Sequence, residues 1–313
     1  MGIFDAIIQG IVQGLTEFLP VSSSGHLLLS QHILGVQENN LFFDVMLHLG
    51  TLIAVLAFYY KLVIKLIGAF FGLVKDVFTG KFSFKNLNDE KRMVVMLIIG
   101  LLPLFILFLP VPGTGTNIKG IAESLSNDSN IIVVGVSLLI TSLLLHTGIS
   151  KAEKGKKRYM HLKGKDGKEG RKSFNVGDAL SVGLTQCAAA VFPGLSRSGS
   201  TLSIGLMRGI NRQTALDYSF VLGIPSIMAA AVLELKEAYE SPMGVSIEIL
   251  PIVVGIVVSA VVGFMAIKLF KWLLATDKMN IFVIYTLVVG LLSVIIGIFE
   301  MMNGVNIFTG LPL

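Results

Sequence analysis

Charge is scarce in this sequence. Charged residues make up 14% of the 313 residues, against about 25% in a typical soluble domain, whereas hydrophobic residues make up 53%. A soluble fold of this length exposes more surface than so few charges can cover, and the mean hydropathy of +0.79 agrees. The composition predicts an all-α polytopic membrane protein and excludes a disordered chain, a disulfide scaffold and a coiled coil.

Several other features are missing as well. The single cysteine, Cys187, cannot form a disulfide within the chain. The sequence has no Walker motif, Rossmann fingerprint or histidine-rich metal tract, which argues against an ATP-driven pump or a redox enzyme. The first residues lack the basic start of a secretory signal, since Asp5 stands there. The net charge of +5 resides in loops between apolar runs, so we expect no nucleic-acid partner.

Six apolar runs are long enough to cross a bilayer, which takes about 20 residues: 41–60, 93–110, 131–147, 215–233, 249–270 and 281–299. Two further apolar stretches, 3–34 and 177–207, are interrupted by proline, glycine and serine. Irregular backbone at membrane depth persists only where it is buried in protein or lines a cavity. We therefore predict two re-entrant helical hairpins beside about six transmembrane helices.

The distribution of lysine and arginine predicts the topology. The loop 61–92 and the basic loop 151–173 are rich in these residues, whereas 111–130 and 234–248 have few. The positive-inside rule then puts the basic loops in the cytoplasm and both termini outside. The two hairpins enter from opposite faces, so we expect one integral membrane domain, 1–313, built as an inverted-topology repeat of about 1–150 and 174–300. Gly14–Glu17 (GLTE) recurs as Gly183–Gln186 (GLTQ), in faint support.

Arg197 is a basic residue left inside an apolar stretch. A charge at membrane depth costs about 2.5–3.5 kcal/mol, so it needs a partner or a bound anion. The surrounding segment Pro193–Thr201 is rich in glycine and hydroxyls. Such a loop before a helix offers backbone N–H groups to an oxyanion, and the guanidinium matches phosphate oxygens. We expect Arg197 to bind an anion, to pair with Glu17, or both.

Glu17 is the acidic counterpart in the first hairpin, and Gln13 shares its helix face four residues earlier. The carboxylate can hold a divalent cation, act as a base or pair with Arg197. One carboxylate and one amide make an incomplete metal site, which substrate phosphates would have to complete. The plainer alternative is a buried glutamate satisfied by hydroxyl groups.

His26 follows three serines and lies nine residues after Glu17, so we predict a catalytic role for it as nucleophile or as general acid or base. A hydrogen-bonded structural histidine is the alternative. His48 shares a helix face with Asp44 and can hold residues of the site in place without contacting the substrate. Two broken hairpins that bring these groups to mid-membrane suit phosphoryl chemistry on a lipid-borne phosphate.

The stretch 13–26 (QGLTEFLPVSSSGH) and the stretch 193–201 (PGLSRSGST) closely resemble the undecaprenyl-diphosphate phosphatase family, the bacitracin-resistance phosphatases. The resemblance covers essentially the whole chain in length and helix order. It implies hydrolysis of undecaprenyl diphosphate to undecaprenyl phosphate and inorganic phosphate, which recycles the lipid carrier for cell-wall synthesis and confers bacitracin resistance. It also implies a divalent cation (Mg²⁺ or Ca²⁺), a bacterial plasma membrane, and an active site that opens to the extracytoplasmic face.

The motif positions of the family imply which residues of this chain form the site. The expected catalytic residues are Glu17, Ser23, His26 and Arg197, and the expected metal ligands are Glu17 and Gln13. The diphosphate of the lipid substrate is expected to contact the hydroxyl and backbone groups of Ser22, Ser24, Gly194, Ser196, Ser198 and Thr201. The family pattern tolerates Gln13 in place of a glutamate.

The sequence leaves the nucleophile, one competing function and the oligomeric state open. The nucleophile is His26, Ser23 or water. A lipid-phosphate flippase using the same midplane anion site is the competing function, because inverted repeats are a transporter architecture. Beyond substrate and membrane lipids, a homodimer is the remaining partner compatible with the sequence.

Overall fold

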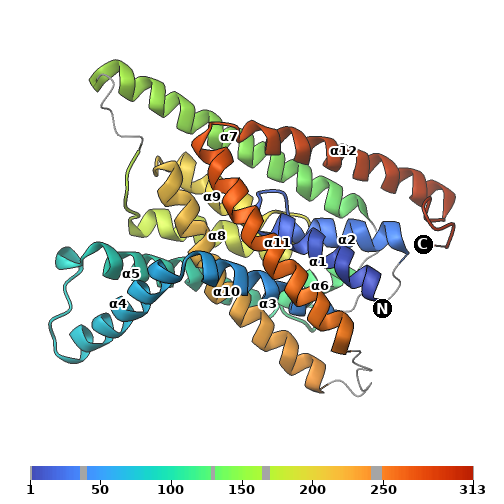
Figure 1. The fold of residues 1–313 in the computed structure, drawn as a ribbon, viewed down its shortest axis with the longest axis horizontal. Helices are drawn as coiled ribbons and strands as arrows, with labels where there is room; N and C mark the ends of the chain where they lie inside the picture. The colour runs from blue at the N-terminus through green and yellow to red at the C-terminus, as the bar shows by residue number, and fades with distance from the viewer. Residues whose placement is uncertain (1, 36–40, 128–130, 164–169, 241–248, 313) are drawn as a thin grey trace.

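The computed structural model describes residues 2–35, 41–127, 131–163, 170–240 and 249–312. These residues form a helical protein without named β-strands (Figure 1). The α-helices are α1 Ile3–Phe18, α2 Ser23–Leu34, α3 Leu41–Phe58, α4 Tyr60–Phe78, α5 Asp89–Leu101, α6 Ile118–Asn127, α7 Ile131–Lys163, α8 Val176–Val191, α9 Arg197–Met207, α10 Arg212–Glu240, α11 Ile249–Ala275 and α12 Asn280–Asn303. The 3₁₀ helices are η1 Phe84–Asn86 and η2 Leu102–Phe108.

The predicted all-α polytopic membrane fold is confirmed. Within the described residues, five segments are long and apolar enough to cross a membrane: Asp89–Phe108, Ile131–Gly155, Arg212–Leu233, Ile249–Ala275 and Asn280–Asn303. The sixth predicted span, 41–60, corresponds to α3, which meets α4 across a bend of 87°. The pair counts as a sixth span if α3 and α4 are taken together.

Two short helix pairs occupy the interrupted apolar stretches. The first pair, α1 and α2, flanks the loop that contains Pro20, and the second pair, α8 and α9, flanks the loop that contains Pro193. Proline fixes its own φ and disfavours a helical residue before it, so α1 and α8 end just ahead of these positions. Each half is too short to cross a bilayer alone.

Glycine-lined contacts fix both hairpins against long helices. α1 lies along α11, and α8 lies along α5 and η2. A Cβ on Gly14 would stand 2.8 Å from the Ser259 carbonyl oxygen, and one on Gly183 would stand 2.3 Å from the Gly100 carbonyl oxygen. α7 packs against both α9 and α12. The division of the chain into two inverted repeats stays a prediction.

Two predicted loops are partly helical. The segment 61–92 contains most of α4 as well as η1, and α7 continues to Lys163 through the first part of the segment 151–173. A polar, lysine-rich sequence can extend an established helix beyond the membrane because lysine and glutamate are good helix formers. Residues 164–169 of the same predicted loop lie outside the described residues.

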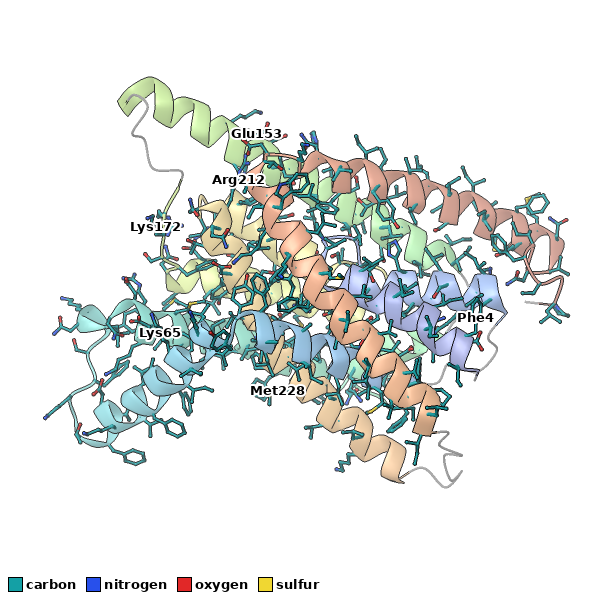
Figure 2. All side chains as sticks on the ribbon, in the orientation of Figure 1. Phe4, Lys65, Glu153, Lys172, Arg212 and Met228 are labelled. Atoms are coloured by element: carbon teal, nitrogen blue, oxygen red, sulfur yellow. The ribbon has the colours of Figure 1, made fainter. Side chains whose placement is uncertain are left out.

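Basic side chains gather toward one end of the long helices. Figure 2 shows Lys65, Lys172 and Arg212 toward the left of the view and Phe4 toward the right. The chain termini lie at the right as well (Figure 1). This separation matches the charge pattern from which the topology was predicted, whereas the side of the membrane that each end faces stays a prediction.

Candidate active site

In both hairpin loops, a serine side chain caps the helix that follows. The Ser22 hydroxyl caps α2 by accepting a hydrogen bond from the Gly25 N–H at 3.2 Å. The Ser196 hydroxyl caps α9 by accepting one from the Gly199 N–H at 3.0 Å. Each serine hydroxyl satisfies one of the backbone N–H groups that the first turn of a helix leaves unpaired, and the helix dipole makes this end positive. Two helix N-termini therefore begin at the loops where the hairpins turn.

The loops touch each other through glycine. A Cβ on Gly25 would lie 2.9 Å from the Gly194 Cα atom, and Gly194 itself has a φ of +88°, which favours glycine. The Gly194 N–H points to the Ser24 hydroxyl at 3.5 Å. This close approach brings the first and second hairpins together, as the sequence predicted from their polar interruptions.

Glu17 is the centre of the resulting polar cluster. Its Oε1 pairs with the Arg197 guanidinium. Its Oε2 accepts hydrogen bonds from the Ser23 hydroxyl at 2.6 Å and the Gln13 amide at 3.0 Å. The His48 Nε2 atom lies 3.6 Å from the same oxygen. The glutamate side chain is 4% exposed, so these contacts stabilise a charge that the interior would otherwise disfavour.

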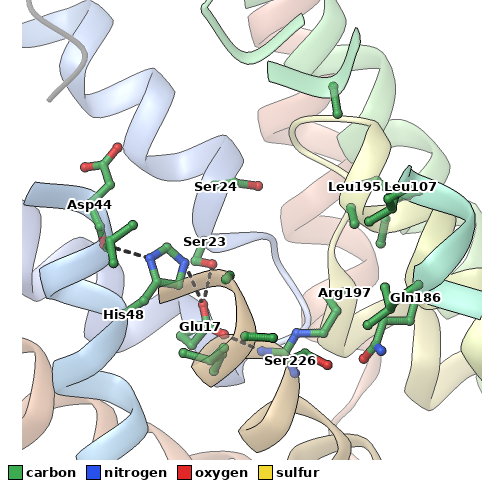
Figure 3. A pocket seen from close by; sticks show the side chains of 18 of the residues that line it. Glu17, Ser23, Ser24, Asp44, His48, Leu107, Gln186, Leu195, Arg197 and Ser226 are labelled. Carbon is green, nitrogen blue, oxygen red and sulfur yellow. Dashed lines mark hydrogen bonds and ion pairs between the residues drawn. The ribbon is translucent and has the colours of Figure 1, made fainter. Parts of the chain in front are cut away.

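The cluster forms one wall of a cavity of about 550 Å³ (Figure 3). Apolar side chains of η2 and α10 line much of it, and polar groups converge at the Glu17 end. Lys119 and Glu123 of α6 also line it. The sequence-predicted residues among the lining are Glu17, Ser22, Ser23, Ser24, Ser196, Arg197 and Ser198. An apolar cavity with a few convergent polar groups is typical of a ligand site.

His26 lies elsewhere. Its Nε2 atom is 2.7 Å from the Tyr285 hydroxyl on α12, its Nδ1 atom is 2.7 Å from the Ser22 carbonyl oxygen, and the two rings stack. The described lining of the cavity does not include His26. The residue holds the loop at Ser22 against α12, and its predicted catalytic role stays a prediction.

Two other predicted phosphate ligands also lie behind the cavity surface. The Thr201 hydroxyl bonds to the Arg197 carbonyl oxygen at 2.8 Å and lies 2.6 Å from the Ser219 hydroxyl. Gly194 belongs to the contact between the loops. Neither residue is among the described lining of the cavity. Both shape the loop that presents Arg197.

The structure brings His48 nearer to the site than the sequence pattern suggested. Its Nδ1 atom is 2.7 Å from the Asp44 carbonyl oxygen, which fixes the ring, and its side chain is 30% exposed at the cavity. Asp44 also lines the cavity and accepts from the Gln31 amide at 3.2 Å. The i, i+4 spacing of Asp44 and His48 was the only signal in the sequence for their position.

The predicted metal ligands provide hard oxygen donors. Gln13 Oε1 is buried and has no hydrogen-bond partner among the described residues, while its amide nitrogen bonds to Glu17. Carboxylate and amide oxygens suit Mg²⁺ or Ca²⁺, but the amide of Gln13 turns its nitrogen, not its oxygen, to Glu17, and Gln13 is not among the described lining of the cavity. In the described part of the chain, no three histidine, cysteine, aspartate or glutamate side chains are arranged so that they could hold a metal ion. Glu17 therefore fits an open site that substrate phosphates and water would complete, whereas the ligand role of Gln13 stays a prediction.

Fold and site together define a polytopic membrane protein with a largely apolar cavity between two broken hairpins, where a buried glutamate pairs with an arginine. The profile of the family described as "Bacitracin resistance protein BacA" matches residues 6–292. The chain belongs to this family.

Curated relatives align over nearly their whole length. An "Undecaprenyl-diphosphatase" of Methanosphaera stadtmanae is 34% identical over 301 residues, which cover 95% of this chain and 99% of the relative. One of Alkaliphilus metalliredigens is 37% identical, with 93% and 97% covered. "Undecaprenyl-diphosphatase 4" of Bacillus cereus is 32% identical, with 93% and 96% covered. These names give no support to the flippase alternative.

Proposed function

We propose that the chain is an undecaprenyl-diphosphate phosphatase, a hydrolase that releases undecaprenyl phosphate and inorganic phosphate. The observation that carries the proposal is the Glu17–Arg197 pair, set among serine hydroxyls in the wall of a largely apolar cavity. The relatives named for this activity support it along the whole chain. The reaction recycles the lipid carrier for cell-wall synthesis, and an abundant enzyme confers resistance to bacitracin.

The groups of the second hairpin bind the diphosphate. Arg197 offers a planar fork to phosphate oxygens, and Ser196 and Ser198 add hydroxyls from the same loop. The N-termini of α2 and α9 contribute positive dipole ends beside this cluster. Because little covalent chemistry is needed for phosphoryl transfer, positioning and charge neutralisation do most of the catalytic work.

The first hairpin provides the groups for the chemical step. An attacking oxygen loses its proton to Glu17 and forms a bond to the terminal phosphorus, the bond from that phosphorus to the bridging oxygen breaks, and the lipid monophosphate leaves. If water attacks, inorganic phosphate forms directly; if Ser23 attacks, a water then hydrolyses the phosphoserine to release inorganic phosphate and restore the hydroxyl. Ser23 and a water beside Glu17 are the attacking groups that the geometry favours, because the Ser23 hydroxyl already donates to Glu17. Glu17, together with Gln13 as the predicted second ligand, would hold a divalent cation, which would neutralise phosphate charge.

Rapid quench with substrate labelled in the terminal phosphate distinguishes the nucleophiles. Attack by Ser23 leaves an acid-stable label on the protein, attack by His26 leaves an acid-labile one, and attack by water leaves none. Replacing Ser23 with alanine removes the acid-stable label if the serine forms it.

We further propose that the protein resides in the plasma membrane of a bacterium with both termini outside and the cavity open to the extracytoplasmic face. The support is that α6, which lines the cavity, belongs to a segment poor in basic residues. One chain holds all the site residues named above, so the proposed activity does not require the homodimer, which stays a prediction.

The test is phosphate release from undecaprenyl diphosphate by purified protein in detergent, with and without chelator. We expect release that the chelator suppresses and that Arg197→Ala abolishes. Arg212→Ala is the matched control, since Arg212 also pairs with a carboxylate but does not line the cavity. Absence of release from the unaltered protein contradicts the proposed function. Release that persists in chelator contradicts the metal requirement alone.

A further inference from the structure

Gln186 on α8 has an environment that the site described so far does not explain. The residue is 2% exposed and lines the cavity. Neither its amide nitrogen nor its amide oxygen has a hydrogen-bond partner among the described residues. Figure 3 shows the side chain on the side of the cavity where Arg197 and Ser226 lie. A buried amide left without partners is costly, so such a group indicates a missing ligand.

The other buried glutamines show what a structural role looks like here. Gln9 Oε1 accepts from the Ser30 hydroxyl at 3.1 Å, and Gln13 and Gln31 each donate to a carboxylate. Each of these three side chains has at least one protein partner, although each also leaves one atom unpaired. Among the buried side chains that the structure describes, Gln186 alone leaves both of its amide atoms unpaired.

Packing does not require an amide at this position. Ala189 and Ala190, three and four residues further along α8, line the same cavity, so this face of the helix is directed at the ligand space rather than at another helix. The preceding turn packs by close approach of Gly183 to α5. A leucine or methionine would fill the position without desolvating polar atoms.

We propose that Gln186 is a substrate-binding residue that donates from Nε2 to a phosphate oxygen of the group held by Arg197 and accepts at Oε1 from a water or a protonated phosphate oxygen. This proposal rests on the proposed phosphatase function. It assigns to the second hairpin a neutral ligand for the diphosphate beside the cationic one.

A neutral side chain is what the charges in the cavity require. Gln186 ends the segment GLTQ, which corresponds to GLTE ending at Glu17 in the first hairpin. Glu17 already uses the Arg197 guanidinium. A second carboxylate at position 186 would face the incoming anion and repel it. Glutamine keeps the length of the side chain and provides a donor instead.

The test compares Gln186→Leu with the matched control Gln9→Leu, a buried glutamine outside the cavity lining. Hydrogen bonds to charged groups are strong enough that losing one lowers binding about 10- to 100-fold. We expect Gln186→Leu to raise KM for undecaprenyl diphosphate by that factor with a smaller change in kcat. The inhibition constant of undecaprenyl methylenediphosphonate, whose bridging carbon resists hydrolysis, should rise in parallel. Gln9→Leu should leave both values unchanged.

The outcomes separate this inference from the proposed function. If the unaltered protein hydrolyses the substrate and Gln186→Leu keeps its KM and inhibition constant, the inference is overturned and the function stands. Equal increases in Gln186→Leu and Gln9→Leu also overturn it. If the unaltered protein releases no phosphate, the function itself fails. Should Gln186→Leu not fold, Gln186→Glu provides the same decision, because the isosteric carboxylate lacks the donor and is expected to raise KM at least as much.

Discussion

At the scale of single residues, the scarcity of charge made Glu17 and Arg197 identifiable. A charge that serves no topological purpose in a membrane protein is retained for a partner or a ligand. Of the two roles considered for Arg197 in the sequence, the structure shows the pairing with Glu17 at the wall of the cavity, and anion binding stays a prediction. Substrate phosphates would share Arg197 with this carboxylate, so the pair keeps the site charged and ordered before an anion arrives.

The direction of His26 could not be predicted in this way. The sequence places His26 in the first hairpin, nine residues after Glu17. This separation does not determine the direction in which the imidazole ring points. Ser22 has a positive φ of 76°, and the chain turns there so that the ring of His26 lies against Tyr285. His48 reaches Glu17 from another helix, a tertiary contact for which one sequence contains little signal.

The first prediction concerns the imidazole that faces the cavity. His48→Asn retains a donor near the Nδ1 position but removes Nε2, the atom near Glu17. We expect kcat for undecaprenyl diphosphate to fall about 10- to 100-fold, as for the loss of a polar contact to a charged group, here the one that orients the Glu17 carboxylate. His48→Gln, whose amide reaches the Nε2 position, should retain more activity. Equal activity of the asparagine variant and the unaltered protein would exclude a role for His48 in the chemical step.

At the scale of helices and loops, long apolar runs were the most predictable feature. The segments 249–270 and 281–299 lie within α11 and α12, since continuous hydrophobicity over a bilayer's thickness leaves the backbone few alternatives. The loop predictions were less accurate. α4 exposes both apolar and basic side chains, and the lysines that made its sequence look like a loop occupy one side of a helix.

Glycine contacts give the second prediction. Gly183→Ala would place a Cβ against the Gly100 carbonyl oxygen, which is backbone and cannot yield easily. We expect α8 to shift and the free energy of unfolding to fall by about 1–3 kcal/mol, the usual cost of overpacking. The control is Gly68→Ala on α4, where no atom lies within 4 Å of the new Cβ. It should be neutral or stabilise by up to about 1 kcal/mol.

Thermal unfolding in one detergent distinguishes the two variants. An unfolding temperature of Gly183→Ala at or above that of Gly68→Ala would show that the hairpin is not held by this contact. Loss of phosphatase activity along with stability in Gly183→Ala alone would indicate that the position of α8 sets the position of the cavity residues.

The third prediction concerns Asp178, which joins three segments at the start of α8, outside the spanning helices. Its carboxylate accepts from Arg171 at 2.7 Å and from Arg208 at 2.8 Å. Burial alone would raise the pKa of Asp178, but the hydrogen bonds from Arg171, from the backbone of Asn175 and from Arg208 outweigh it and hold the pKa below its ordinary 3.8. The ionised form is therefore the one that stabilises the fold.

Folding lowers the pKa of Asp178. The contribution of the ionised carboxylate to the free energy of unfolding is therefore complete above about pH 4, and it is lost as the pH falls through the lowered pKa. We expect Asp178→Asn to lower the free energy of unfolding at pH 7 by about 1–3 kcal/mol. The difference in free energy of unfolding between Asp178→Asn and the unaltered protein should decrease as the pH falls below 4. Unfolding temperatures of both proteins, measured in detergent between pH 7 and pH 3, test this prediction. A difference in unfolding temperature that stays constant over that range would contradict it.

At the scale of the whole molecule, the pattern of basic residues connects the fold to the side on which the reaction occurs. α5 and η2 form one span between the basic segment 61–92 and the segment 111–130. The positive-inside rule places the first in the cytoplasm and the second outside. Since α6 lies in the second segment and lines the cavity, the orientation of this one span decides which face the cavity opens to.

The last prediction tests that orientation in intact cells. Cys187 is replaced by alanine, and single cysteines are introduced as Lys85→Cys and Thr114→Cys, both at exposed positions flanking the span. We expect a membrane-impermeant maleimide to label Thr114→Cys in intact cells and Lys85→Cys only after permeabilisation. The reverse pattern would place α6 and the cavity mouth in the cytoplasm. A substrate that carries its diphosphate at the outer face could then not reach Glu17 and Arg197 without first crossing the membrane.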